Sequence, residues 1–437
     1  MLERTAYLDK IKDAGNEPRV KLIAGIRHGG KSFLFYQFIS ELKLSGIDDE
    51  HIVHLNFESP IFGVPRTVRE VEAFIGQKTG KSGKYYIFFD EIQRVSGWEK
   101  LVNALLQQGN FDIYVSISDA AVLLKKPAKA AAREKKQILI NFKPFSFSEY
   151  MHFFAPEVKA GGGLLNRAIA IKNSETDHFD NYMRYGGFPA VYTGLYDSYT
   201  GLSCITEEDI KTIAVRLNGI YSSILLNDVI RRSKIRNLEL LEQIINNIFC
   251  NIGNENSTRN IVEGLKKSRH KKNLSLVVPY IKALENAFII KKVFCCNLST
   301  GKILRTNAKF FIGDHALLNT VIGIRDSSVT GILKNILMQD LERREYTVYT
   351  GKFGDKSVDF VAKRGDAFVL LQTVDKNTDA NMLEEKIEGL KFFNDDEVFA
   401  AKKKYVIFLD ADASFEREPD GVIYYISLRN FLLLETI

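Results

Sequence analysis

The sequence predicts a multidomain α/β protein whose N-terminal part is built around a parallel sheet. Short apolar runs alternate with helix-like stretches from Met1 to about Tyr150, which is typical of strands and helices in such a sheet. The chain has 437 residues, enough for two to four domains, and 45% of them are hydrophobic, enough for their cores. A glycine-rich turn directly after the first apolar run marks an edge of the sheet where a ligand can bind.

The N-terminal elements can be placed in order along the chain. The helix-like stretch Phe33–Leu42 follows the first expected strand, and similar stretches separate the later ones. The expected strands are Val20–Ala24, Ile52–Phe57, Tyr85–Phe89, Ile113–Ser118 and Ile138–Phe142. We expect helices on both faces of this sheet. Ligands of such sheets bind beyond the carboxyl ends of the strands, so polar residues at these ends are the first candidates for a site.

The end of the first expected strand carries the complete phosphate-loop pattern, Gly25-x-x-x-x-Gly30-Lys31-Ser32. Glycines let backbone N–H groups approach phosphate oxygens, and the following helix points its positive end at them. The pattern assigns Lys31 to the β- and γ-phosphates and the Ser32 hydroxyl to Mg²⁺. The predicted nucleotide-binding residues are Gly25, Ile26, Arg27, His28, Gly29, Gly30, Lys31, Ser32 and Phe33. The alternative is a fortuitous glycine turn, which requires neither the strand before it nor the helix after it.

A second motif follows the apolar run Tyr85–Phe89, where two carboxylates, Asp90 and Glu91, come in succession. Beside a phosphate loop, a strand of this kind presents an aspartate that holds Mg²⁺. We expect Glu91 to orient and deprotonate the attacking water. The alternative is that both acids only cap the next helix, because acidic side chains favour helix N-termini. Together with the phosphate loop, the pair predicts a site for ATP and Mg²⁺.

These motifs and several later ones give the chain a resemblance to a known family. The segments that carry it are, in order, Gly25–Ser32, Asp90–Gln93, Gly97–Trp98, Pro144–Tyr150, Tyr182–Pro189, Tyr280–Ile290 and Val358–Val361. Their order and spacing resemble the AAA-type P-loop ATPases that carry a C-terminal domain known as DUF4143, over nearly the whole chain. The resemblance implies an ATPase core, a helical lid, a winged-helix-like segment and a C-terminal α/β domain similar to restriction endonucleases. The expected boundaries are 1–158, 159–235, 236–307 and 308–437, in that order.

The chain departs from this family where relatives contact the γ-phosphate. Residues 113–120 read Ile-Tyr-Val-Ser-Ile-Ser-Asp-Ala instead of ending in a Thr-Gly-Ser-Asn-type sequence. The resemblance implies that Ser118 and Asp119 sense the γ-phosphate, although the charge of Asp119 is unfavourable beside a triphosphate. Relatives carry a Gly-Arg pair where this chain has Lys135 and Lys136, and lysine lacks the planar fork of arginine. We therefore expect slow hydrolysis. The whole lysine-rich stretch 125–136 is more simply a solvated basic loop.

Residues 257–288 have the rhythm of a helix-turn-helix, with a basic segment between the two helices. The segment contains Lys266, Lys267, Arg269, Lys271 and Lys272. In a winged-helix module, these side chains would neutralise phosphates of double-stranded DNA. Two alternatives remain, because charged loops are usually only solvated and winged helices also serve as protein-docking modules.

The C-terminal part predicts a separate α/β domain with an inactive nuclease site. Its expected strands are Thr347–Tyr349, Ser357–Ala362, Phe368–Thr373 and Tyr405–Leu409. The resemblance to restriction endonucleases implies that Asp359 and Gln372 are the remains of a metal site. Val374 stands in place of the catalytic lysine and Lys334 in place of a helix acid, so Mg²⁺ would lack ligands. Glu342, farther along the same expected helix, is the obvious substitute acid. An active nuclease is therefore only the third functional hypothesis.

Composition limits the remaining function classes. A net charge of +6, from 60 basic and 54 acidic residues, permits a nucleic-acid partner without requiring one. No apolar run reaches the roughly 18–20 residues that span a bilayer, and the start of the chain has no secretory pattern, so we expect a cytoplasmic protein without a membrane partner. The four cysteines include no C-x-x-C pair and predict reduced structural thiols.

The motifs and the composition together predict an ATP-binding protein with slow Mg²⁺-dependent hydrolysis. We expect hydrolysis to be coupled to a conformational change of the winged-helix and nuclease-like half. The alternative from another class is a nucleotide-gated module that binds DNA or a protein partner and turns over little ATP. No guanine-reading motif follows Asp90, which favours ATP over GTP.

Overall fold

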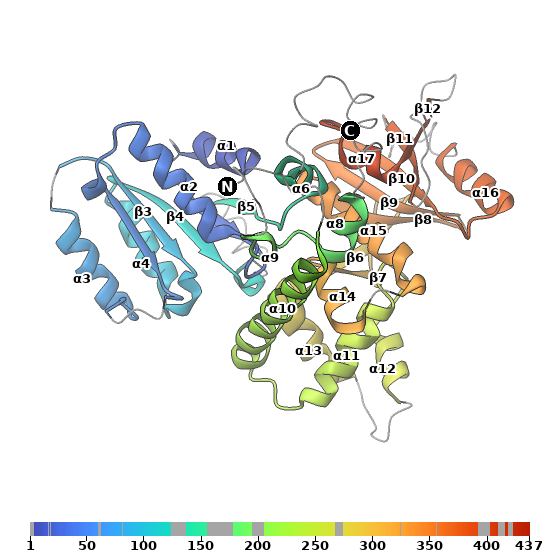
Figure 1. The fold of residues 1–437 in the computed structure, drawn as a ribbon, viewed down its shortest axis with the longest axis horizontal. Coiled ribbons are helices and arrows are strands. Elements are labelled where there is room, and N and C mark those ends of the chain that lie inside the picture. Colours follow the sequence, from blue (N-terminus) through green and yellow to red (C-terminus); the bar gives the residue numbers. More distant parts are fainter. Residues whose placement is uncertain are drawn as a thin grey trace.

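Two sheets, one in each half of the chain, are joined by a group of helices in this computed structural model (Figure 1). The structure describes residues 4–15, 17, 19–59, 63–80, 82–123, 137–154, 178–194, 205–266, 274–323, 325–354, 356–391, 403–409, 416–417 and 423–437. Within these ranges, no helix combines the length and the apolar composition that crossing a bilayer requires.

The N-terminal sheet has five parallel strands in the order β2-β3-β4-β1-β5. They are β1 Val20–Ala24, β2 Ile52–Asn56, β3 Tyr85–Asp90, β4 Phe111–Ile117 and β5 Gln137–Asn141. Every residue of β1 and β4 is buried, as expected for central strands that are covered on both faces. The predicted parallel sheet is confirmed, and each expected strand is correct to within one or two residues at either end.

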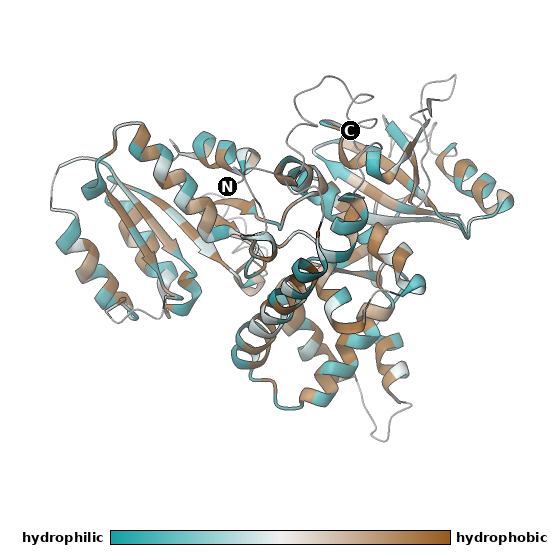
Figure 2. Ribbon diagram, in the orientation of Figure 1, coloured by the Kyte–Doolittle hydropathy of each residue, from teal (hydrophilic) through white to brown (hydrophobic). Residues whose placement is uncertain are grey.

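Helices cover both faces of this sheet. They are α1 Thr5–Ala14, α2 Lys31–Leu44, α3 Val68–Lys78 and α4 Trp98–Gln107, with the short 3₁₀ helices η1 Asp49–His51, η2 Ile92–Arg94 and η3 Ala120–Val122. Alternate residues of β1 show the two faces, because Leu22 packs in the core with α3 and α4, whereas Ile23 packs with α1 and α2. Figure 2 shows the apolar strands between helices whose outer surfaces are hydrophilic.

Helices dominate the middle of the chain. They are α6 Phe147–Phe154, α8 His178–Tyr185, α9 Pro189–Tyr192, α10 Glu207–Ile224, α11 Leu238–Cys250, α12 Thr258–Lys266, α13 Leu274–Asn286 and α14 Ala316–Ile322. A capping box starts α10, in which Thr206 and Asp209 bond to each other's backbone N–H groups. The end of α10 continues into a π-helical segment, Leu225–Arg231. The expected boundary between core and lid, at 158/159, lies outside the described residues.

The C-terminal sheet has eight strands in the order β12-β13-β11-β10-β9-β8-β6-β7, with parallel and antiparallel neighbours. Its strands are β6 Ile290–Asn297, β7 Ile303–Ile312, β8 Thr347–Phe353, β9 Lys356–Arg364, β10 Ala367–Val374, β11 Lys403–Phe408, β12 Glu416–Arg417 and β13 Ile423–Ser427. Helices α15 Asp326–Arg343, α16 Ala380–Lys391 and α17 Leu428–Leu432 accompany them. The winged-helix prediction assigns Lys291–Asn297 and Ile303–Thr306 to a two-stranded wing. These residues fall in β6 and β7, which lie at the edge of the larger sheet because β6 also pairs with β8.

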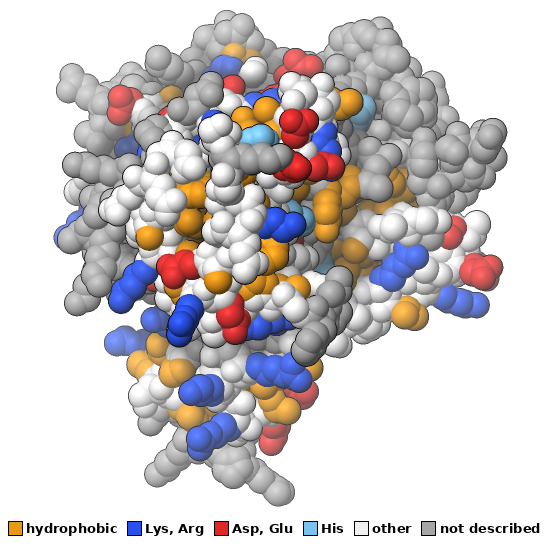
Figure 3. All heavy atoms as spheres, turned by 90° about the vertical axis from the view of Figure 1, so that its left-hand side faces the viewer, with side chains coloured by type: hydrophobic (Ala, Val, Ile, Leu, Met, Phe, Trp, Pro, Cys, Tyr) orange, Lys and Arg blue, Asp and Glu red, His pale blue; other side chains and the backbone are white. Residues whose placement is uncertain are grey.

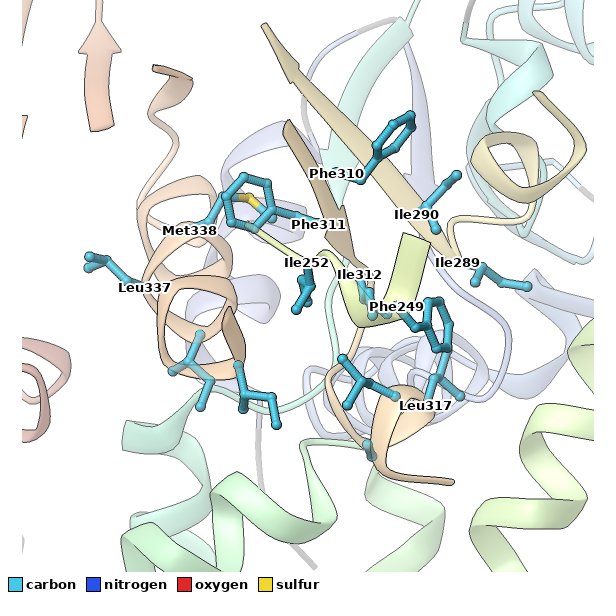
Figure 4. Close-up of a cluster of buried hydrophobic side chains, with 14 of the residues drawn as sticks. Phe249, Ile252, Ile289, Ile290, Phe310, Phe311, Ile312, Leu317, Leu337 and Met338 are labelled. Carbon is cyan, nitrogen blue, oxygen red and sulfur yellow. The ribbon is translucent and has the colours of Figure 1, made fainter. Parts of the chain in front are cut away.

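One hydrophobic core connects the middle helices with this sheet (Figure 4). Phe249, near the end of α11, lies by Leu317 of α14, and Met338 of α15 lies by Phe311 of β7; Ile252, just after α11, belongs to the same core. The expected boundary at 307/308 falls inside β7, where this core is continuous. The four domain boundaries themselves stay predictions.

Ion pairs join the N-terminal sheet to α15. Lys143, two residues after β5, donates to Glu342 Oε2 at 2.6 Å, and Glu342 also pairs with Lys291. Arg343 donates to the Pro144 carbonyl at 3.0 Å. Glu342 thus contacts two lysines at the junction of the two halves, and its role as a substitute nuclease acid stays a prediction.

Candidate functional site

The phosphate loop connects β1 to α2 through a tightly packed turn. Gly25 lies against β5, since a Cβ atom on it would come within 2.0 Å of the Phe142 carbonyl oxygen. Gly30 has a φ of +105° and His28 a φ of +62°, so both adopt the left-handed conformation. The glycine at position 25 is therefore required by the neighbouring strand, in addition to any ligand. Strain at His28, a residue that is not glycine, is typical of functional loops.

Lys31 is the first residue of α2, two residues earlier than the sequence predicted for the helix start. Its ammonium group is buried and donates to the carbonyl oxygens of Gly25 and Ile26, both at 3.0 Å. It also lies 3.2 Å from Glu91 Oε1. Ser32 and Phe33 follow in the first turn and are partly exposed. The loop thus brings the predicted phosphate lysine and the predicted base into direct contact.

Asp90 ends β3 and is fully buried. Ser116 of β4 donates to its Oδ1, while its Oδ2 has no hydrogen-bond partner among the described residues. Burial and the charge of Glu91 raise the pKa of Asp90, although hydrogen bonds from Ser116 and Ser32 oppose this. A buried carboxylate oxygen without a partner, next to a serine hydroxyl, fits Mg²⁺, which binds proteins through one or two carboxylates plus substrate phosphates.

Glu91 follows β3 with a φ of +56°, which turns its side chain back toward the phosphate loop. Its Oε2 accepts hydrogen bonds from Ser118 Oγ at 2.6 Å and Gln93 Nε2 at 2.5 Å. Burial alone would raise the pKa of Glu91, but Lys31, Arg27 and these hydrogen bonds outweigh it and lower the pKa to about 2. A carboxylate so acidic is a weak base, so Glu91 can accept a proton efficiently only after Lys31 has moved away.

The two predicted γ-phosphate sensors lie at the end of β4 but differ in orientation. Ser118 is buried and contacts Glu91 and Gln93. Asp119 accepts from Ala121 N at 2.9 Å as the N-cap of η3, and its Oδ2 lies 4.0 Å from Arg232 Nε. The unfavourable charge expected of Asp119 is therefore partly balanced by Arg232. Lys135 and Lys136 lie outside the described residues.

Side chains from the middle helices also reach the site. The most buried of these, Asp228, was not predicted from the sequence. Asp228, in the π-helical segment, contacts Arg27 of the phosphate loop and Arg232. Burial alone would lower the pKa of Arg27, but the hydrogen bonds and the charge of Asp228, with the charges of Glu91 and Asp90, outweigh it and raise the pKa. The only signal for Asp228 in the sequence is a carboxylate inside the apolar stretch Ile224–Ile230.

Glu58 is a second residue that the sequence did not indicate. It follows β2 and pairs with Arg27 and, at 3.2 Å, with Arg94. The phosphate-loop arginine is therefore held by acids from both the N-terminal sheet and the middle helices.

The predicted nuclease remnant lies in the other sheet. Gln372 Oε1 accepts from Asp359 N at 3.1 Å, so β9 and β10 bring the two residues together. Three lysines face the Asp359 carboxylate, namely Lys386 at 3.0 Å, Lys334 at 3.4 Å and Lys309 at 4.0 Å. These cations outweigh burial and lower the pKa of Asp359. Among the described residues, no group of three or more acids, histidines or cysteines could hold a metal ion.

The predicted DNA-binding residues fall largely outside the described part of the chain. Lys267, Arg269, Lys271 and Lys272 lie there, and Lys266 is described only as the end of α12. On the face drawn in Figure 3, Lys and Arg side chains are interspersed with Asp and Glu. DNA contact by this segment stays a prediction.

Comparisons with known proteins identify the N-terminal part. Residues 17–151 match the AAA_14 model, an AAA domain, so the N-terminal sheet belongs to a P-loop ATPase-like domain. Residues 176–328 match DUF8612, a domain of unknown function. The DUF4143 assignment that the resemblance implied is therefore not confirmed.

Whole-chain relatives are uncharacterized proteins. One from Haemophilus influenzae is 31% identical over 373 residues, covering 85% of this chain and 86% of the relative. One from Methanocaldococcus jannaschii is 25% identical over 389 residues, covering 86% of this chain and 80% of the relative. Among solved structures, a Walker-type ATPase of Pyrococcus abyssi is similar at 15% identity, with a TM-score of 0.44 over 74% of this chain and 96% of that one. This likeness is too distant to bear on function.

Proposed function

The chain belongs to the same family as the uncharacterized Haemophilus influenzae protein, and from this premise we propose that it binds ATP and hydrolyses it slowly with Mg²⁺. One observation carries the proposal. Lys31, the first residue of α2, and Glu91, which directly follows β3, lie 3.2 Å apart, beside a buried Asp90 oxygen that has no partner among the described residues. A phosphate-binding cation, a metal-binding acid and a base are thus gathered at one edge of the sheet.

Each residue has a distinct role in this proposal. Lys31 leaves Glu91 to contact the β- and γ-phosphates, while the loop backbone from Gly25 to Phe33 surrounds them. Ser32 and Asp90 hold Mg²⁺, which offsets the phosphate charge when it is bound. Glu91, relieved of the Lys31 charge, becomes a stronger base and takes the proton of the attacking water. Ser118 keeps the Glu91 carboxylate oriented.

The same geometry supports the proposal that turnover is slow. Lys31 must break its contact with Glu91 and two backbone hydrogen bonds before it can serve a phosphate. Asp119 adds negative charge near the γ-phosphate, and Arg232 offsets it only from 4.0 Å. We expect turnover below the usual range of about 1–100 s⁻¹ for efficient phosphoryl transfer.

Replacing Lys31 with Ala should weaken binding of a labelled, non-hydrolysable ATP analogue by about 100-fold or more, because a charged hydrogen-bond donor to two phosphates is lost. Equilibrium titration of the full chain measures this. Lys43→Ala is the matched control, since Lys43 lies in the last turn of the same helix, where it pairs with Asp49. Equal affinity in wild type and Lys31→Ala would show that the loop does not bind nucleotide.

We also propose a role for the C-terminal half, namely a winged-helix-like module and a nuclease-like domain that cuts nothing and contacts double-stranded DNA or a protein. The succession of helices α11–α13 supports the module, although the β6–β7 pair that follows them belongs to the larger sheet. The lysines that face Asp359, in place of metal-binding acids, support a domain that cuts nothing. The alternative function, nucleotide-gated binding with little turnover, is tested by single-turnover hydrolysis with and without duplex DNA.

Changing Lys266, Lys267, Arg269, Lys271 and Lys272 together to Ala should weaken DNA binding and flatten its salt dependence. The slope of log K against log[salt] should fall by about 0.9 for each lost phosphate contact. Titrations of a fluorescent duplex at several salt concentrations give the slope. If wild type binds DNA and the slope is the same in the variant, this segment does not contact DNA and the module is better explained by protein docking.

A further inference from the structure

A buried carboxylate joins the phosphate loop to the middle helices. Arg27, two residues after Gly25, donates to both oxygens of Asp228, from Nε to Oδ2 at 2.6 Å and from Nη2 to Oδ1 at 2.8 Å. The exposed fractions of the two side chains are 3% and 1%. This is the bidentate geometry of a strong arginine–carboxylate pair, and it links residues 201 positions apart.

The Asp228 carboxylate also binds a second arginine, Arg232, which contacts the residue after β4. Arg232 Nη2 donates to Asp228 Oδ1 at 2.5 Å, and Arg232 Nη1 donates to the Ser118 carbonyl at 2.9 Å. Ser118 in turn donates to Glu91. Asp228 therefore stands between a phosphate-loop arginine and an arginine that contacts the strand bearing the predicted γ-phosphate sensors.

The backbone at Asp228 is built for this contact. The π-helical segment Leu225–Arg231 replaces ordinary helix where Asp228 and Arg232 face the sheet. π-Helical turns are rare and occur frequently at functional sites. Apolar residues in place of a buried ion pair are often as stabilising, so stability alone does not explain a buried acid here.

Further contacts show that the middle helices lie directly on the loop. Ser223 Oγ of α10 is 3.1 Å from His28 Nε2, and a Cβ atom on Gly30 would be 3.4 Å from Pro189 Cγ of α9. Because Arg27 belongs to the phosphate loop and contacts Asp228, the Arg27–Asp228–Arg232 cluster lies beside the loop, where its charges act on a bound triphosphate. Its negative charge is attracted by the two guanidinium groups and repelled by the carboxylate between them.

We propose that Asp228 is a positioning residue that holds Arg27 and Arg232 in place and sets how strongly the site prefers ATP over ADP. The inference rests on the proposed nucleotide site and adds to it a residue outside the N-terminal sheet. The Asp228 carboxylate offsets part of the positive charge of Arg27 and Arg232 and holds both side chains in fixed positions. Without the carboxylate charge, Arg27 keeps only its ion pair with Glu58 among the described residues, and Arg232 loses its closest acid, so both guanidinium groups attract the more highly charged triphosphate more strongly but lose their fixed geometry.

Asp228→Asn tests this, because it removes the charge and keeps the shape. The ratio of the dissociation constants for ADP and a non-hydrolysable ATP analogue should rise about tenfold, the size of one charge–charge interaction at a partly buried site. The single-turnover rate with ATP should fall. Titrations and quenched-flow measurements on the full chain give both. Glu208→Gln, which removes an exposed acid from the first turn of α10, should change neither value.

A double variant with Arg232 distinguishes a positioning role of Asp228 from general damage to the fold. In an Arg232→Gln background, Asp228→Asn should shift the ratio much less, because the second guanidinium is already gone. Arg232→Gln alone should lower the ratio, and this variant decides the matter if Asp228→Asn does not fold. An unchanged ratio in folded Asp228→Asn, or equal shifts in both backgrounds, would overturn the inference while leaving ATP binding intact. Wild-type protein that binds neither nucleotide would overturn the proposed function and this inference with it.

Discussion

Replacing Glu91 with Gln should leave ATP binding intact and slow single-turnover hydrolysis by about 10²–10⁴-fold, the usual contribution of a general base. Glutamine has nearly the shape of glutamate and can still bond to Ser118 and Gln93, but it cannot accept a proton from water. It also no longer holds Lys31 through the 3.2 Å ion pair, so affinity for ATP should stay the same or rise. A loss of rate without a loss of affinity identifies a chemical role.

The measurement compares quenched-flow rates and titrations for wild type and Glu91→Gln. Glu72→Gln is the matched control, because it removes an exposed acid of α3 in the same domain. Wild-type turnover in Glu91→Gln would remove Glu91 from the mechanism. A parallel loss of ATP binding would instead show that Glu91 mainly supports the phosphate loop.

Replacing Asp359 with Asn should destabilise the C-terminal sheet by about 3 kcal/mol. Lys309, Lys334 and Lys386 would then face one another without the carboxylate that neutralises them, and breaking a buried ion pair on one side costs about 3–5 kcal/mol. We expect the lower end of this energy range because about a fifth of each lysine side chain is exposed to solvent. Hydrogen exchange of the β9 and β10 amides reports this local stability.

The pH dependence of this effect has a definite sign. The pKa of Asp359 is lowered in the folded protein, so the unfolded chain takes up the proton first as the pH falls below the ordinary value of 3.8. The stability that Asp359 contributes is present above that pH and is lost below it. The difference between wild type and Asp359→Asn should therefore shrink in acid.

Lys386→Gln is the control for Asp359→Asn, because it removes one of three cations and leaves the carboxylate paired. Its effect should be well below that of Asp359→Asn. Mg²⁺-dependent DNA cleavage by wild type that disappears in Asp359→Asn would contradict the inactive-nuclease prediction. Equal stability of wild type and Asp359→Asn would show that the three lysines do not need the Asp359 carboxylate to neutralise them.

Local patterns were sufficient to predict the N-terminal sheet. The strands of this sheet are apolar runs that alternate with helices, so this alternation predicts their type and their parallel direction, whereas their order in the sheet comes from the structure. The same patterns could not show that β6 pairs with β8, because that pairing depends on residues about fifty positions away. For this reason two strands of an eight-stranded sheet looked like an isolated wing.

The sequence by itself determined the parallel sheet and named Lys31, Asp90 and Glu91 as a group, because a phosphate loop and an acidic strand end have fixed local spacing. Ser118 was named only through the resemblance to a family. Only the tertiary structure decided that Lys31 pairs with Glu91, that Asp228 and Arg232 reach the loop, and that three lysines surround Asp359. The physical reason is that charges pair through space. A carboxylate in an apolar helix shows that a partner is needed, but only the packing of that helix against the sheet determines which partner it finds.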